Sequence, residues 1–144
     1  PVLPFTRERL DSVELYPFKE AIRAGVSGMM VGHLQVPVIE PIGDLPSSLS
    51  RNVVYGLLTE ELAFKGLIFT DALAMKGVAG SKSVCLQALQ AGNDMVLAPR
   101  RLKEEMDAVL EAVEKENFRK KKLMQNVGKY SLTNIFWGWN VNRL

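Results

Sequence analysis

Asp71 is the residue in this sequence best placed for nucleophilic chemistry. It follows a short apolar run, residues 67–69, that begins after Gly66 and stops at polar side chains. A continuous apolar run of this length predicts a strand buried on both faces of a parallel sheet. Catalytic groups collect at the carboxyl ends of such strands, because the loops leaving them form one concave face. Asp71 is therefore a candidate nucleophile, and the alternative is that its side chain caps the turn that follows.

His33 and Met75 are the candidates for contact with a substrate. His33 closes an apolar stretch, residues 26–33, that predicts an earlier strand. A lone histidine is commonly a hydrogen-bonded structural residue, but at the mouth of a parallel strand it is also a candidate for the wall of a substrate site. Met75 lies in the loop after Asp71, where a methionine either packs against the core or contacts a ligand.

The apolar pattern predicts alternating helices and strands that would position these residues. Predicted helices cover residues 7–24, with a break at Pro17, and residues 50–65, 81–91 and 100–115. Predicted strands cover residues 26–33, 67–69 and 93–98. The proline-containing loop of residues 34–50 is longer than a minimal connection, which is typical of loops that shape a site. The alternation predicts an α/β fold with a parallel sheet.

Composition excludes several classes of function. The 18 Lys and Arg and 16 Asp and Glu residues are scattered and give a net charge of +2, so no nucleic-acid role is expected. One histidine and one cysteine, far apart, form no metal-ligand cluster, and neither a metal nor another cofactor is expected. Cys85 lies in the apolar pattern of a helix, which favours a buried structural thiol over a reactive one. No apolar run approaches the roughly 20 residues of a membrane span.

A series of short blocks follows one another in a recognisable order, at residues 14–19, 24–26, 30–33, 46–50, 57–62, 64–71 and 91–95. Together these blocks resemble the catalytic barrel of glycoside hydrolase family 3, in its bacterial β-N-acetylglucosaminidase subgroup. The resemblance covers residues 1–115, which we take as a partial family 3 domain. It implies a (β/α)8 TIM barrel of which this chain is the C-terminal half, strands six to eight with their helices.

The same resemblance implies an activity and a substrate. Asp71 takes the position of the nucleophile of a retaining hydrolase, which attacks the anomeric carbon and forms a covalent glycosyl-enzyme that water then releases. The implied substrate is a carbohydrate with a terminal β-linked N-acetylhexosamine. A carboxylate at a strand end can also stabilise the positive charge of the oxocarbenium-like transition state before it bonds.

The acid/base group of the family is expected to be missing from this chain. In the family a Lys-His-Phe-Pro-Gly-His-Gly block and a nearby loop, whose Asp and His move the proton, precede the part matched here. His33 lies on a different segment. We therefore expect the isolated chain to be inactive. It should need the N-terminal half of the barrel or self-associate, because a half barrel leaves its end strands unpaired.

Three other interpretations compete with this one. A β-glucosidase is the nearest, but family β-glucosidases tend to carry Ser-Asp-Trp around the nucleophile, where this chain has Thr70-Asp71-Ala72. A noncatalytic or phospho-accepting doubly wound α/β domain would need acidic residues at the end of the first strand to hold Mg²⁺, and that strand ends in Gly32-His33. A noncatalytic fragment or truncated gene product is the third, and it is compatible with the hydrolase interpretation.

Residues 116–144 do not resemble the family and form a separate tail. They include a basic run, residues 118–122, and an aromatic run, residues 135–139. A membrane-surface or partner-binding tail is one interpretation, and a solvated linker followed by an apolar packing segment is another. A third is that the tail is a frameshifted reading of the final barrel helix, in which A-rich glutamate codons would read as lysines.

Overall fold

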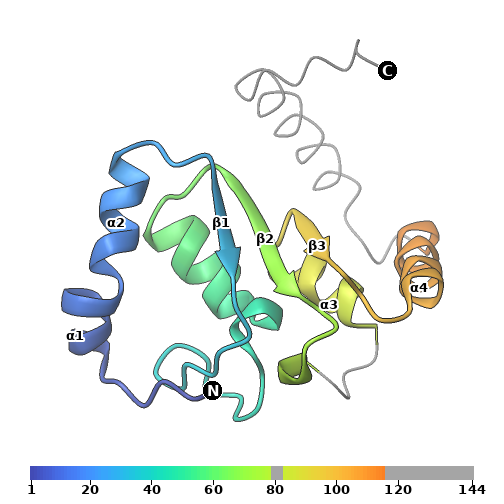
Figure 1. The fold of residues 1–144 in the computed structure, drawn as a ribbon, viewed down its shortest axis with the longest axis horizontal. Coiled ribbons are helices and arrows are strands. Elements are labelled where there is room, and N and C mark those ends of the chain that lie inside the picture. Colours follow the sequence, from blue (N-terminus) through green and yellow to red (C-terminus); the bar gives the residue numbers. More distant parts are fainter. Residues whose placement is uncertain (79–82, 116–144) are drawn as a thin grey trace.

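The computed structural model describes residues 1–78 and 83–115 and contains one parallel sheet of three strands. The strands are β1 (Gly28–Val31), β2 (Leu67–Ala72) and β3 (Met95–Leu97), and β2 lies between the other two (Figure 1). Helical segments separate them along the chain. The alternation confirms the predicted α/β class. The proposed tail, with its basic and aromatic runs, lies outside the described residues.

The first helical segment is broken where the proline requires it. Helix α1 (Arg7–Arg9) continues into a wider turn, η1 (Leu10–Glu14), and α2 (Tyr16–Arg23) then begins with Pro17 in its first turn. Proline is tolerated there because its missing N–H would have no partner within the helix. Gly25 ends the segment with a φ of +82°, a conformation that glycine adopts without steric cost.

The segment between β1 and β2 contains a 3-10 turn, η2 (Ser47–Leu49), and a wide helix, η3 (Asn52–Glu61). The predicted helix ran on to residue 65, but Ala63 has a φ of +53°, so the chain leaves the helix earlier and Phe64 enters the core. After β2 come η4 (Lys76–Val78), α3 (Val84–Ala91) and α4 (Leu102–Glu114). Gly92 ends α3, as the sequence predicts.

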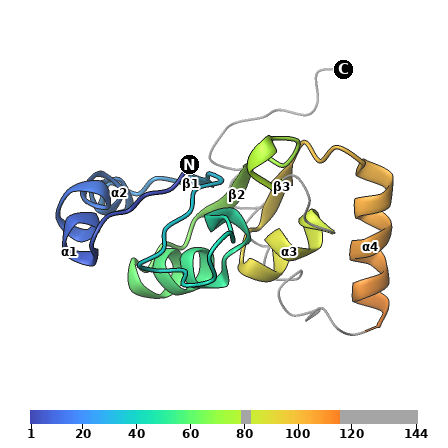
Figure 2. The same ribbon diagram turned by 90° about the horizontal axis from the view of Figure 1, so that it is seen from below.

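Two apolar clusters hold these elements together. One joins β1 and β2 to η3 and consists of Met29, Val31, Val54, Phe64, Ile68 and Ala91. The other lies beyond the carboxyl end of β2 and consists of Leu49, Leu73, Val78, Val84, Cys85 and Ala88. Figure 2 shows α3 and the helix of residues 52–61 on the same side of the sheet. The core therefore lies between that face of the sheet and these two helices.

The other face of the sheet is less covered than the sequence suggests. Burial alternates along β1, where Met29 and Val31 are buried and Met30 is 55% exposed. The register aligns Met30, Phe69 and Met95 in one row across the three strands. The expectation that the apolar run of residues 67–69 is buried on both faces is wrong for the described residues, because Ile68 is buried there while Leu67 and Phe69 are partly exposed. Burial alternates along β1 and β2 because α3 and η3 cover the same face of the sheet.

Candidate active site

Asp71 is the penultimate residue of β2, the central strand of the sheet. Along β2 the buried residues Ile68 and Thr70 alternate with the partly exposed Leu67, Phe69 and Asp71. Because side chains alternate between the faces of a strand, Asp71 projects from the face opposite the core. Its Oδ1 accepts a hydrogen bond from the Ala72 N–H at 2.7 Å, which orients the carboxylate.

His33 lies just after β1 in the sequence and is buried, with only 7% of its surface exposed. Its Nδ1 lies 2.7 Å from the Ser48 Oγ, and its Nε2 lies 3.1 Å from the carbonyl oxygen of Ala72. A carbonyl oxygen only accepts, so Nε2 carries the proton and donates to Ala72. In the neutral ring Nδ1 then accepts from the Ser48 hydroxyl. Both nitrogens are therefore occupied by the protein, and contact of His33 with a substrate stays a prediction.

The three residues singled out in the sequence meet at Ala72. Asp71 accepts from the Ala72 N–H, and the Ala72 carbonyl accepts both from His33 and from the backbone N–H of Met75, at 3.0 Å. The Met75 side chain is 49% exposed, so it lies open at this end of the sheet rather than in the core. Whether it contacts a substrate stays a prediction.

Ser48 and Asn93 hold His33 in place, Ser48 by direct contact and Asn93 through the Ser48 carbonyl. Neither residue is singled out by the sequence as a candidate site residue. Both side chains are fully buried. The Asn93 Nδ2 donates to the Ser48 carbonyl at 2.8 Å and to the Ala88 carbonyl at 2.8 Å. Neighbouring Ser47 donates through its Oγ to the Gly32 carbonyl at 2.7 Å. The one local signal for these contacts is the Pro-Ser-Ser pattern at residues 46–48, a pattern typical of a tight turn.

Glu40 is a buried carboxylate that the sequence analysis missed. Its Oε2 accepts from the Ser50 Oγ at 2.6 Å and from the Asn52 Nδ2 at 3.1 Å, and its Oε1 accepts from the Ile42 N–H at 3.0 Å. A buried carboxylate is tolerated when donors surround it in this way. Glu40 therefore fastens the loop of residues 34–50 to the start of η3.

Cys85 is buried in the second apolar cluster, as expected. Burial raises the pKa of its thiol to about 11, and the nearby Glu105 carboxylate contributes to the same shift. The thiol is therefore protonated at neutral pH and is no nucleophile there. Within residues 1–78 and 83–115, no three His, Cys, Asp or Glu side chains gather as they would around a metal ion. In the same part of the chain, no helix is long and apolar enough to cross a membrane.

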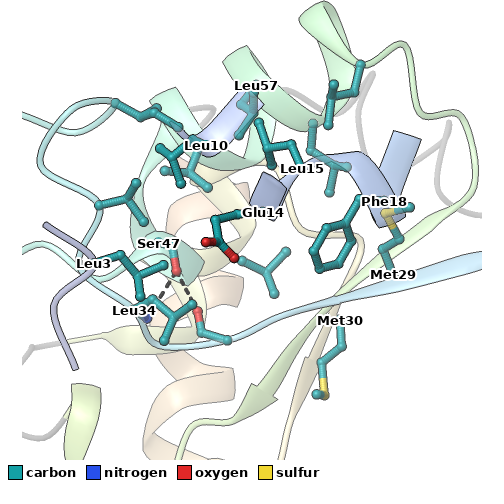
Figure 3. Close-up of a pocket in the computed structure, with 17 residues that line it drawn as sticks. Leu3, Leu10, Glu14, Leu15, Phe18, Met29, Met30, Leu34, Ser47 and Leu57 are labelled. Atoms are coloured by element: carbon teal, nitrogen blue, oxygen red, sulfur yellow. Dashed lines mark hydrogen bonds between the residues drawn. The ribbon is translucent and has the colours of Figure 1, made fainter. Parts of the chain in front are cut away.

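An apolar cavity of about 180 Å³ lies apart from this site, between the N-terminal helices, β1 and η3. Leu10, Leu15 and Phe18 line one side, and Figure 3 shows the Glu14 carboxylate among them. Glu14 pairs with Arg9, with 3.0 Å between the Arg9 Nη2 and the Glu14 Oε1. Asp71, His33 and Met75 do not line this cavity.

The chain is similar to several known proteins. A family model described as the glycosyl hydrolase family 3 N-terminal domain matches residues 1–131. A β-hexosaminidase from Nitrosomonas eutropha is 37% identical over 91 residues, which are 61% of this chain and 25% of that protein. One from Chromobacterium violaceum is 33% identical over 111 residues, 75% of this chain and 30% of that protein.

A solved structure shares the fold. The glycoside hydrolase family 3 β-N-acetylglucosaminidase from a Paenibacillus species superposes with a TM-score of 0.87 and 38% identity, over 93% of this chain and 26% of that chain. The present chain thus spans about a quarter to a third of the length of the relatives it matches. On the family match over most of its length, the chain belongs to the glycosyl hydrolase family 3 N-terminal domain family.

Proposed function

We propose that residues 1–115 are part of the catalytic domain of a retaining hydrolase that removes terminal β-linked N-acetylhexosamine, with Asp71 as its nucleophile. The position of Asp71 carries the proposal. Its carboxylate lies at the carboxyl end of the central parallel strand, projects away from the core, and is oriented by the Ala72 N–H. Strand ends of this kind supply the catalytic groups of α/β barrels.

The chemistry has two steps. An Asp71 oxygen attacks the anomeric carbon as the bond to the glycosidic oxygen breaks, and the leaving oxygen takes a proton from a general acid. Water then attacks the same carbon, gives its proton to the conjugate base of that acid, and releases Asp71. We expect the general acid from the part of the domain that the relatives contain and that this chain does not match. The isolated chain should accordingly be inactive.

The substrate class rests on the relatives. The two bacterial proteins are named β-hexosaminidases, and the Paenibacillus protein is a β-N-acetylglucosaminidase. The Thr70-Asp71-Ala72 sequence also differs from the Ser-Asp-Trp pattern of the β-glucosidases. We therefore place an N-acetylhexosaminide ahead of a plain β-glucoside, with His33 and Met75 forming the wall of the site beside Asp71.

The sheet itself supports a place in a larger barrel. The aligned row of Met30, Phe69 and Met95 would line the barrel interior, and the outer edges of β1 and β3 would pair with further strands. In isolation these edges and the exposed Met30 favour association of the chain with itself or with the remaining strands.

The test places this segment in a complete barrel and then replaces one oxygen of the Asp71 carboxylate. Residues 1–115 replace the matching segment of the Paenibacillus enzyme, so that Asp71 is the proposed nucleophile of the resulting chimera. The folded chimera should hydrolyse an aryl β-N-acetylglucosaminide faster than the corresponding glucoside, and Asp71→Asn should abolish turnover. Asp107→Asn, the same change at an exposed position on α4, is the matched control and should have no effect. Unchanged turnover in Asp71→Asn would disprove the proposal.

A further inference from the structure

We propose that His33, held by Ser48, is the positioning residue for the Asp71 carboxylate. The inference rests on the proposed role of Asp71 as the nucleophile and extends it to the residues that fix its geometry. His33 does not touch Asp71 directly. It acts through Ala72, to which both side chains are bonded.

The peptide between Ala72 and Leu73 is fixed at both ends. Its carbonyl oxygen accepts from the His33 Nε2 at 3.1 Å and from the Met75 N–H at 3.0 Å, which uses both lone pairs of the oxygen. Its N–H, on Leu73, donates to the Leu97 carbonyl at 2.9 Å. Of these partners, His33 is the one that holds the peptide through a side chain, so it is the one that a substitution can remove.

The Asp71 carboxylate depends on the other peptide of Ala72. The Ala72 N–H donates to the Asp71 Oδ1 at 2.7 Å. Ala72 has two soft backbone torsions, and a change in either turns its N–H relative to its carbonyl. The peptide on the N–H side lies in β2, and the contacts above hold the peptide on the carbonyl side, so neither torsion is free to change and the N–H keeps its direction toward the carboxylate.

Two buried contacts hold His33 in the form that can do this. The Ala72 carbonyl requires the tautomer with the proton on Nε2, the Ser48 Oγ, 2.7 Å from Nδ1, then donates to that nitrogen, and Asn93 holds the Ser48 backbone through its carbonyl. Gly77 packs against the other side of His33, and a Cβ at Gly77 would lie 2.8 Å from the His33 Cβ. The imidazole therefore has little room to turn.

Position matters for a nucleophile because reacting atoms must approach in a narrow geometry. A misplacement of about 1 Å can lower the rate about 100-fold. Loss of the His33 contact should therefore lower kcat far more than it changes KM, since both ring nitrogens of His33 are bonded to the protein and only its carbon atoms are left to form the wall of the site.

Two substitutions of similar polarity separate positioning from mere packing. A Gln amide nitrogen stands close to the place of the histidine Nε2, whereas the shorter Asn reaches only the place of Nδ1. In the chimera, His33→Gln should keep kcat within about threefold of the parent, and His33→Asn should lower it about 10- to 100-fold at similar KM. Both values are taken per folded molecule, measured by circular dichroism. Parental kcat in His33→Asn, or an equal loss in His33→Gln, would overturn the inference.

A spectroscopic test needs no activity. His33 is the one histidine among the 144 residues, so the imidazole ¹⁵N signals of the full chain belong to it alone. We expect a slowly exchanging Nε2–H and an unprotonated Nδ1, with faster exchange of the Nε2–H in Ser48→Ala because the ring loses one of its two anchors. A proton on Nδ1 would overturn the inference. The inference and the proposed function can fail separately: a failure of the proposed function appears in Asp71→Asn, and a failure of the inference appears in the His33 pair while Asp71→Asn remains inactive.

Discussion

The Ser48 hydroxyl lies 2.7 Å from the Nδ1 of His33, and the two residues are 15 positions apart in the sequence. Both side chains are buried, and the contact connects the turn η2 to the second residue after β1. The Nε2 on the opposite side of the ring meets Ala72, next to the proposed nucleophile. The Ser48–His33 contact therefore contributes to the stability of the fold and also holds Ala72, which orients the Asp71 carboxylate.

Replacing Ser48 with Ala should destabilise the fold. The change removes the hydroxyl and leaves the buried Nδ1 without its partner, at a cost of about 1–3 kcal/mol in the free energy of unfolding. Urea titration of the 144-residue chain measures this cost. Ser27→Ala, at an exposed position before β1, should change stability by less than about 0.5 kcal/mol. Equal effects of the two substitutions would show that the buried contact contributes no stability.

Replacing Glu40 with Gln should loosen the loop of residues 34–50. Both carboxylate oxygens accept hydrogen bonds, and a Gln side chain must turn its NH₂ group toward one set of these donors. We expect a loss of about 1–3 kcal/mol and faster proteolysis within the loop. Glu60→Gln, at an exposed position, is the control for the same chemical change. Unaltered cleavage in Glu40→Gln would contradict the assigned role.

Replacing Gly77 with Ala should displace His33. The new Cβ would lie 2.8 Å from the His33 Cβ, which is too close for either atom to stay in place. We expect a loss of about 1–3 kcal/mol in the unfolding free energy and a fall in kcat of the chimera. Gly43→Ala places the same methyl group in open space and should be tolerated. Equal unfolding free energies and equal kcat values in Gly77→Ala and Gly43→Ala would contradict the close packing of Gly77 against His33.

The Cys85 thiol should react slowly in the folded chain and should make stability depend on alkaline pH. Burial, aided by Glu105, raises its pKa from 9.0 to about 11. A raised pKa favours the protonated form in the folded state, so this contribution to stability is complete below about pH 9 and is lost as the pH rises toward 11. Thiol labelling at pH 8 should be slow until urea unfolds the chain, and Cys85→Ala should flatten the decline in stability between pH 9 and 11. Rapid labelling of the native chain would argue against a buried thiol.

The sequence was sufficient where a local signal determines the backbone. Pro17 can occupy the first turn of a helix but not its interior, and Gly25 and Gly92 adopt positive φ values that end helices. The position of Asp71 at the end of β2 follows from an apolar run that stops at polar residues. These features are properties of a few neighbouring residues, so no knowledge of the tertiary structure is needed to predict them.

The supporting contacts could not be predicted because they join distant parts of the chain. Asn93 meets the Ser48 carbonyl 45 residues away, and His33 meets Ala72 39 residues away. The early end of η3 has the same origin, since Phe64 enters the core and forces Ala63 into a positive φ. Local spacing predicts which residues are placed at the strand ends, but the tertiary structure decides which groups they bind.

The most direct test of the account identifies the residue that bonds to the sugar. The chimera is mixed with an aryl β-N-acetylglucosaminide, quenched with acid during turnover and digested, and the mass of the peptide containing Asp71 is measured. We predict a fraction of this peptide heavier by one N-acetylhexosaminyl group, with the group on Asp71. The same sugar on a different residue would contradict the account, because the nucleophile would then lie elsewhere.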